Sequence, residues 1–336
     1  MILVTGGTGL VGSHLLYQLA LKNNVIRATH RVDSDTERVK LLFKFYSKNF
    51  NHLFEKIKWV EADINNLPQL EDAFCGISYV YHCAGYISFD PSRYRTLRRV
   101  NIKGTSNIVN LCIKNKIRKL CYVSSVASLG YNSKKIDENN FWDGNKDKSS
   151  YAISKYGGEM EVWRGAQEGI KSIIVNPGII VGPGFWNSAI GLIFKMVINK
   201  KRFHTNSKTG YIGVEDVVNA MICLMNSKIE NERYILVNEI LSYKKVIKIV
   251  SNLCGYDYKS TYMSKFKLKI FLILDLILSK FLNRERRLNK TLIKTFSRDF
   301  NYSSEKIKKK LNGFEFTSIH ESFEKSCQFY SQERSF

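Results

Sequence analysis

The sequence predicts a doubly wound α/β fold, in which a parallel β-sheet carries helices on both faces. Short apolar runs alternate with amphipathic helical stretches over the first half of the chain. Such alternation is typical of right-handed β-α-β units, whose strands lie parallel. The predicted strands are residues 1–4, 25–29, 57–61, 79–82, 119–124 and 172–176, and the clearest helices are residues 11–21, 101–114 and 151–168.

The pattern loosens after about residue 177, where Gly182, Pro183 and Gly184 interrupt it. A strand and a helix return over residues 210–226, and a further strand follows at 233–237. We therefore expect a larger sheet domain and a smaller, mostly helical C-terminal domain at the carboxyl edge of the sheet. The larger domain comprises residues 1–178 with about 210–240, and the smaller one about 179–209 and 241–336.

Composition is that of a folded protein with a sizeable core, because 44% of the 336 residues are hydrophobic and 12% are aromatic. The seven cysteines form neither a CxxC pair nor a Cys/His cluster, so we expect reduced thiols and no metal site. Met1 leads directly into a strand without the basic segment of a signal peptide. These features predict a cytoplasmic protein.

Nearly half of the formal net charge of +22 lies in residues 261–310, which hold 14 Lys and Arg against 4 Asp and Glu. Nucleic acid is one partner that such charge could attract. No zinc-finger spacing or RNP-like motif accompanies the charge, so we favour solvated surface charge instead. Residues 265–282 mix lysines with Phe, Leu and Ile, which is compatible with peripheral membrane contact. We favour a helix that covers a substrate pocket.

A glycine-rich turn follows the first predicted strand, in the order Thr5-Gly-Gly-Thr-Gly-Leu-Val-Gly12. Its first glycine permits a tight turn, the second lets backbone approach a pyrophosphate, and the third lets helix and sheet pack closely. The N-terminus of the following helix attracts the anion. The turn therefore predicts dinucleotide contacts from Gly6, Thr8, Gly9, Leu10, Val11 and Gly12.

The second predicted strand runs into Arg31, where NAD sites usually have a carboxylate for the ribose hydroxyls. An arginine instead suits the 2′-phosphate of NADP, and Arg38 supplies a second cation within two helical turns. Asp33 and Asp35 are close enough in sequence to reach the ribose, which is the argument for NAD. We predict NADP in preference to NAD.

A serine, a tyrosine and a lysine form the candidate catalytic group. Ser124 and Ser125 end a predicted strand, while Tyr151 and Lys155 stand four residues apart and share one helical face. Tyrosine titrates near pH ~10 in water, so it needs a neighbouring cation to act as an acid or base at neutral pH. A serine hydroxyl can bind the substrate oxygen, and the lysine can also hold the nicotinamide ribose.

Together these motifs resemble the extended short-chain dehydrogenases/reductases, the group of NAD-dependent epimerases and dehydratases, over nearly the whole chain. The resemblance implies a Rossmann fold for the larger domain and substrate binding by the smaller one. It identifies Ser125 rather than Ser124 as the catalytic serine, Tyr151 as the acid/base and Lys155 as its partner. By the same resemblance, further cofactor contacts are Asp63, Ile64, Ala84, Gly85, Tyr151, Lys155, Pro177, Gly178 and Ile179.

Three short segments, residues 27–31, 38–40 and 311–316, resemble the branch of this family that contains dihydroflavonol reductases and 3β-hydroxysteroid dehydrogenases. One position departs from this branch: Gly130 stands where plant dihydroflavonol reductases have a substrate-binding asparagine. This difference argues against a flavonoid substrate. The resemblance also allows a homodimer.

The leading hypothesis is an NAD(P)-dependent oxidoreductase that interconverts a secondary alcohol and a ketone on a small-molecule substrate. Two alternatives remain open. A nucleotide-sugar epimerase or dehydratase would reduce and reoxidise its cofactor within one turnover. A non-catalytic NADP-sensing protein would bind the cofactor without needing the Ser125, Tyr151 and Lys155 set.

Overall fold

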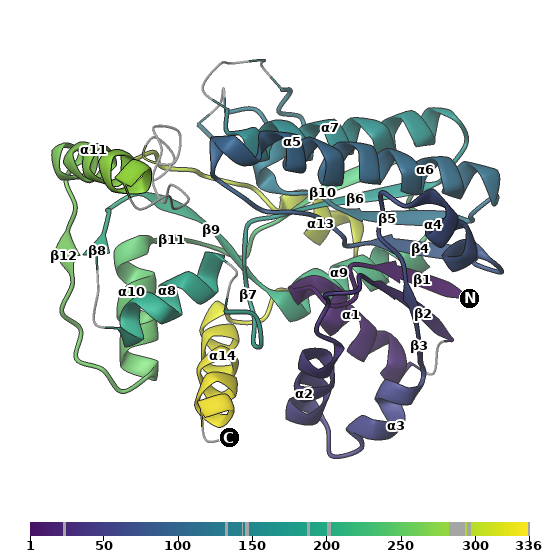
Figure 1. Cartoon of the computed structure of the whole chain (residues 1–336), viewed down its shortest axis with the longest axis horizontal. Helices are drawn as coiled ribbons and strands as arrows, with labels where there is room; N and C mark the ends of the chain where they lie inside the picture. The colour runs from purple at the N-terminus through teal and green to yellow at the C-terminus, as the bar shows by residue number, and fades with distance from the viewer. Residues whose placement is uncertain are drawn as a thin grey trace.

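The computed structural model describes residues 1–22, 25–131, 134–142, 144, 148–186, 189–199, 203–281, 293 and 297–334, and it contains the parallel sheet (Figure 1). The described sheet has seven strands in the order β10-β6-β5-β4-β1-β2-β3, and all neighbours are parallel. The strands are β1 (Ile2–Thr5), β2 (Ile26–His30), β3 (Ile57–Glu61), β4 (Tyr79–His82), β5 (Lys119–Val123), β6 (Ser172–Pro177) and β10 (Glu232–Leu236). The doubly wound prediction is confirmed.

The order of the strands reverses between β1 and β4, which lie side by side although β2 and β3 separate them in sequence. In open α/β sheets, ligands bind in the crevice beyond the carboxyl ends of the strands at such a reversal. The glycine turn follows β1 directly and residues 83–85 follow β4. The topology therefore brings both predicted cofactor segments to one place.

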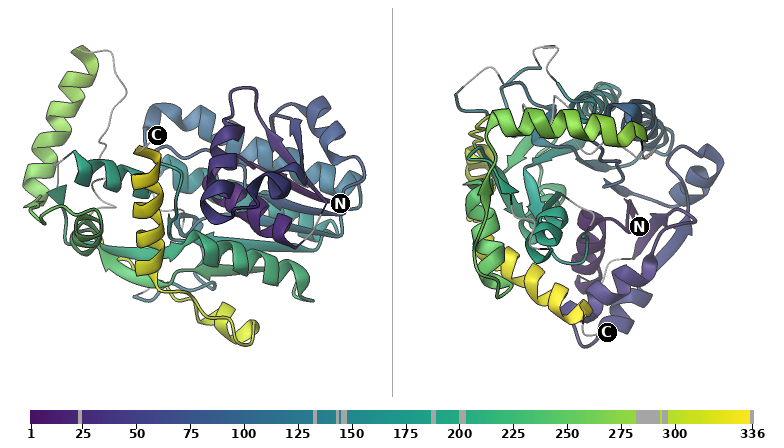
Figure 2. Two further views of the ribbon diagram at one scale, coloured as in Figure 1. Left: turned by 90° about the horizontal axis from the view of Figure 1, so that it is seen from below. Right: turned by 60° about the vertical axis from the view of Figure 1, so that its left-hand side comes forward.

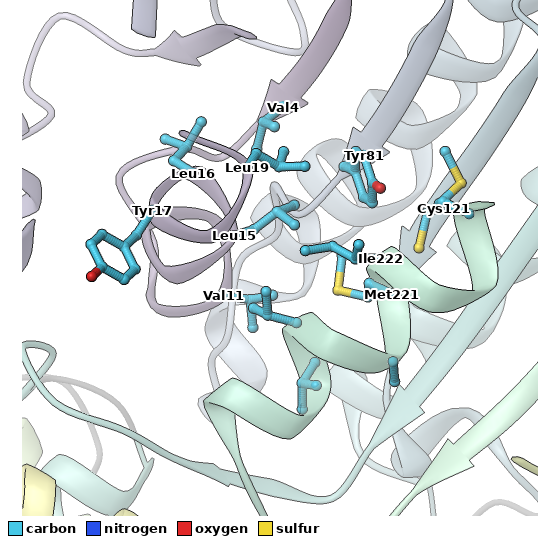
Figure 3. Close-up of a cluster of buried hydrophobic side chains, with 14 of the residues drawn as sticks. Val4, Val11, Leu15, Leu16, Tyr17, Leu19, Tyr81, Cys121, Met221 and Ile222 are labelled. Carbon is cyan, nitrogen blue, oxygen red and sulfur yellow. The ribbon is translucent and has the colours of Figure 1, made fainter. Parts of the chain in front are cut away.

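Helices cover both faces of the sheet (Figure 1). One face packs against α1 (Leu10–Leu21), α2 (Thr36–Tyr46), α3 (Phe50–Glu55) and α9 (Val214–Asn226), and the other against α4 (Leu67–Phe74), α6 (Thr105–Lys114) and α7 (Ser150–Gln167). Successive strand residues alternate between the two clusters, with Cys121 in the first and Tyr122 in the second. Figure 3 shows the first cluster, where Leu15 of α1 faces Ile222 of α9.

The predicted helix over residues 101–114 begins differently from the expectation. A short helix, α5 (Tyr94–Leu97), runs into a π-helical segment over Arg98–Gly104, and α6 continues from Thr105. Two close contacts accompany the wider turn: a Cβ on Gly104 would lie 2.5 Å from Ile64, and one on Gly158 of α7 would lie 2.4 Å from the Asn101 carbonyl oxygen. π-Helical turns recur at functional sites, and this one places Asn101 beside residues 85 and 86.

The smaller part contains more strand than the sequence predicts. A three-stranded sheet has the order β11-β9-β7, and β8 pairs with β12. Its elements are β7 (Ile179–Val181), α8 (Ala189–Ile198), β8 (Phe203–His204), β9 (Lys208–Gly213), β11 (Glu239–Ser242), α10 (Tyr243–Leu253), β12 (Thr261–Tyr262), α11 (Lys265–Phe281) and α14 (Ile319–Arg334). Helix α13 (Glu305–Lys310) instead packs against β10, with Ile307 in the core of the larger sheet. The exact domain limits stay a prediction.

The C-terminal helix α14 lies between the smaller part and the N-terminal helices of the larger one (Figure 2). Its Glu333 forms an ion pair with Arg38 of α2, at 3.2 Å. Its Lys325 forms a second with Glu215 of α9, at 2.6 Å. Helix α14 therefore joins the two parts through charged contacts as well as through its apolar side.

Helix α11 stands at the edge of the molecule (Figures 1 and 2). Leu268 packs with Met263 and Ile293, but six large apolar side chains of the helix are exposed. These are Phe266, Ile270, Phe271, Ile273, Leu274 and Leu276. Within the described residues no helix combines the length and apolarity needed to cross a bilayer. Residue 282, at the end of the predicted helix, lies outside the described residues. That this helix covers a substrate pocket stays a prediction.

Candidate functional site

The glycine turn is so compact that it has no room for a side chain at Gly6 or at Gly12. Gly6 has a φ of +70°, and a Cβ there would lie 2.6 Å from the Ala84 nitrogen. A Cβ on Gly12 would lie 2.1 Å from the Gly6 carbonyl oxygen. Thus Gly6 allows β1 and residue 84 to approach, and Gly12 allows α1 to pack on the turn.

Gly9 occupies the N-cap position of α1 and provides no side-chain acceptor for the N–H groups of the first turn. Leu10, Val11 and Gly12 follow it, and their N–H groups lie at the positive end of the helix. Thr8 is half-buried beside them. The first turn of α1 therefore has free N–H groups, and the exposed Gly9 leaves room for an anion to approach them. This arrangement fits a dinucleotide pyrophosphate.

The two arginines predicted to select NADP have different surroundings. Arg31 is exposed directly after β2, and its backbone N–H donates to Ser34 Oγ at 3.0 Å. Arg38 is engaged elsewhere: its Nη1 donates to the Gly184 carbonyl at 2.6 Å, and its Nη2 pairs with Glu333. Arg31 is therefore the more available cation of the two.

The segments predicted to flank the adenine and the nicotinamide lie at the carboxyl edge of the sheet. Asp63 Oδ1 accepts from the backbone and side-chain N–H groups of Asn65, at 2.8 and 2.9 Å. Ile64 packs on Gly104. Ala84 and Gly85 follow β4, and a Cβ on Gly85 would lie 3.9 Å from Lys155 Nζ.

Pro177, Gly178 and Ile179 form the passage from β6 into β7. The Gly178 N–H donates to the Leu236 carbonyl at 3.0 Å, and a Cβ on Gly178 would lie 2.5 Å from the Gly210 carbonyl oxygen. A glycine at position 178 thus allows the main sheet and the smaller sheet to meet at this edge.

The candidate catalytic residues come from two elements that the fold brings together. Ser125 follows β5 and caps a short 3₁₀ turn, and Tyr151 lies in the first turn of α7. The Ser125 hydroxyl lies near enough to Tyr151 to affect its ionisation. Burial raises the pKa of Tyr151, and the neighbouring Ser125 hydroxyl opposes the rise. The Phe89 ring lies 5.8 Å from the Tyr151 ring and forms part of its apolar surroundings.

Lys155 is 5% exposed and lies one turn after Tyr151 on the same helix. Its Nζ donates to Tyr122 Oη at 2.9 Å and to the Val123 carbonyl at 2.8 Å. Burial lowers the pKa of Lys155 to about 7, against the opposite effect of the Glu159 carboxylate. The ammonium form is therefore held in place and is easily deprotonated.

A buried carboxylate, Glu159, is a residue that the sequence analysis did not single out. It lies eight residues after Tyr151 on the same face of α7 and is fully buried. Its Oε2 accepts from Ser124 Oγ at 2.8 Å, Ser128 Oγ at 2.8 Å and Asn176 Nδ2 at 2.9 Å. The spacing of four residues from Lys155 is the signal that could have identified it.

The Glu159 network extends to Ser125 and to β10. The Ser125 carbonyl accepts from Ser128 Oγ at 2.7 Å and from Asn176 Nδ2 at 3.2 Å. On the other side, Arg233 forms an ion pair with Glu159 Oε1 at 3.0 Å. Glu159 thereby connects the loop that carries Ser125 to the helix that carries Tyr151 and Lys155. No group of His, Cys, Asp and Glu suited to a metal ion occurs within the described residues.

Comparison with known proteins identifies the family of the chain. Residues 2–237 match the sequence model of the NAD dependent epimerase/dehydratase family, so the chain belongs to that family. Tetraketide alpha-pyrone reductase 2 of Arabidopsis thaliana is 27% identical over 266 residues, covering 74% of this chain and 81% of that protein. A putative dihydroflavonol 4-reductase of Synechocystis is 29% identical over 262 residues, covering 75% and 72%.

The crystal structure of UDP-glucose 4-epimerase from Thermotoga maritima superposes with a TM-score of 0.77 at 21% identity, covering 99% of each chain. That likeness concerns the fold. The family and its reductase relatives make this chain an NAD(P)-dependent enzyme of the extended short-chain dehydrogenase/reductase type, in the dihydroflavonol-reductase-like branch.

Alanine at two positions of the glycine turn separates folding from cofactor binding. We expect Gly12→Ala to lower the stability by about 1–3 kcal/mol, because its Cβ would overlap the Gly6 carbonyl oxygen. Gly9→Ala, whose Cβ would lie 3.4 Å from that oxygen, costs less than about 1 kcal/mol. Both variants should bind NADPH more weakly in a calorimetric titration. Unchanged NADPH affinity of Gly9→Ala would contradict a pyrophosphate at this turn.

The buried lysine predicts a pH dependence of stability. Its pKa falls from 10.5 to about 7 on folding, so between these values the unfolded chain binds a proton that the folded protein does not. Wild-type stability should therefore rise from pH 7 to pH 9 by about 2–3 kcal/mol relative to Lys155→Met, as measured by urea unfolding without cofactor. Lys103→Met, at an exposed position, is the control. If the unfolding free energies of wild type and Lys155→Met change with pH in parallel, the ammonium of Lys155 is not destabilised by burial.

Proposed function

We propose that this enzyme is an NADPH-dependent reductase that converts a ketone into a secondary alcohol, and that the reverse reaction uses the same residues. The observation that carries the proposal is that Ser125 lies next to Tyr151, with Lys155 one helical turn away and the glycine turn at the same sheet edge. Several relatives are reductases by name, among them tetraketide alpha-pyrone reductase 2 and a putative dihydroflavonol 4-reductase, which supports the same reaction class.

Each residue has a defined role in this reaction. When bound, the nicotinamide supplies the hydride for the carbonyl carbon. Ser125 donates a hydrogen bond to the carbonyl oxygen, and Tyr151 delivers the proton to it. The raised pKa of Tyr151 keeps the phenol protonated, which is the form that a carbonyl reduction needs. Lys155 holds the ribose and compensates the charge on Tyr151 after the proton has left.

The alternative of a nucleotide-sugar epimerase or dehydratase uses the same three side chains. The two reactions differ in cofactor balance: a reductase consumes one NADPH for each product, whereas an epimerase retains its cofactor and consumes none. Mass spectrometry of small molecules released from the purified protein, together with NADPH absorbance during turnover, separates them. We propose the reductase because several relatives are named as such.

Replacing the tyrosine distinguishes an enzyme from a cofactor-sensing protein. We expect Tyr151→Phe to lower kcat/KM by about 10²–10⁴-fold while NADPH affinity stays within a few-fold, because only the proton donor is removed. The assay follows NADPH absorbance with a panel of aryl and alicyclic ketones. Tyr156→Phe, on the same helix and stacked on Trp142, is the matched control. Full turnover by Tyr151→Phe would overturn the proposed acid.

The preference for NADP is proposed on the exposed guanidinium of Arg31. We expect Arg31→Ala to weaken NADPH binding by about tenfold, the effect of losing one charged contact, and to leave NADH binding unchanged. Titration of the same preparation with both dinucleotides supplies the control. Equal loss for both dinucleotides, or tight NAD in the purified protein, would argue against a 2′-phosphate site.

A further inference from the structure

Two cysteines meet at the contact between α10 and the C-terminal helix α14. Cys254 is the C-cap residue of α10, and Cys327 lies within α14, 73 residues later. Their sulfur atoms are 3.2 Å apart, although both thiols are free. The site lies away from Tyr151 and the glycine turn, so neither the fold nor the proposed reaction accounts for this pair.

The two thiols differ in exposure and in ionisation. Cys254 is half-buried and Cys327 is buried. Either thiol can donate in the contact between them. The contact lowers the pKa of Cys254 and raises that of Cys327. Because the thiolate is the reactive form of cysteine, Cys254 is the better nucleophile at neutral pH.

A cavity of about 460 Å³ opens beside the pair. Leu253, Glu324, Cys327 and Gln328 line it together with two further residues of α14, Ser331 and Gln332. Most of this lining is polar or ionisable, which suits a small hydrophilic reagent. Cys327 lies in the wall of this cavity and Cys254 is partly exposed, so a small peptide-like disulfide can approach the pair from solvent.

We propose that Cys254 and Cys327 form a reversible disulfide by exchange with a low-molecular-weight disulfide, for which oxidised glutathione is the probe. The Cys254 thiolate attacks one glutathione sulfur, the glutathione S–S bond breaks, and one glutathione leaves and takes up a proton. Cys327 then loses its proton, attacks Cys254 Sγ and expels the second glutathione. The two cysteines lose two electrons, and these reduce the glutathione disulfide to two thiols.

The disulfide fastens α14 onto α10. Helix α14 also contacts the larger part of the molecule through two ion pairs, Glu333 with Arg38 and Lys325 with Glu215. Oxidation therefore fixes one end of the connection between the cofactor half and the smaller half. It also closes a long loop in the unfolded chain, which lowers the entropy gained on unfolding.

The test uses the full chain, incubated with oxidised and reduced glutathione at several ratios. We expect peptide mapping to show a link between residues 254 and 327, an intact mass lower by two hydrogen atoms, and a Tm raised by about 5 °C. Dithiothreitol should reverse all three changes. Cys254→Ser and Cys327→Ser should each lose the link and the rise in Tm.

A Cys75→Ser/Cys223→Ser double variant is the matched control, because it removes two exposed cysteines and leaves the pair intact. It should retain the link and the shift in Tm. A glutathione adduct that stays on Cys254 without a protein disulfide would overturn the proposal. So would a link that forms without any rise in Tm, or a shift in Tm that survives in Cys254→Ser.

Discussion

The fully buried carboxylate of Glu159 fixes the positions of the groups that the candidate site needs. An unpaired charge in a protein interior is expensive, and removing one partner of a buried pair costs about 3–5 kcal/mol. Glu159 escapes this cost because Arg233, Ser124, Ser128 and Asn176 all donate to it. These partners come from the turn after β5, from β6 and from β10. The distance between Ser125 and the Tyr151 helix therefore depends on one carboxylate.

Tyr151, Lys155 and Glu159 lie on one side of helix α7, because they are spaced four residues apart. The negative charge of Glu159 favours the ammonium of Lys155, and burial disfavours it. Burial has the larger effect, so Lys155 titrates near neutral pH. A lysine poised in this way can accept or release a proton as charge develops on its neighbours. The apolar sheet strands supply the dry surroundings that make the effect large.

Much of the fold and part of the site could be predicted from the sequence. Residues 172–176 and 233–237 match β6 and β10 closely because each strand contains a run of buried, mostly apolar residues. The predicted strand that begins at residue 210 overlaps β9, but its partners β7 and β11 were missed because they have only three and four residues. The partners of Arg38 lie 146 and 295 residues away, and local patterns contain no information about such contacts. The same holds for the pairing of Glu159 with Arg233.

The bonds of Arg38 have a consequence for how the two ends of the chain influence each other. The same guanidinium that binds Glu333 and the Gly184 carbonyl is within the segment that follows β2, where the ribose end of a dinucleotide belongs. A 2′-phosphate that engages Arg38 must compete with Glu333 for it. Coupling of this kind is reciprocal. Undocking of the last helix would then strengthen cofactor binding by the same factor by which bound cofactor promotes the undocking.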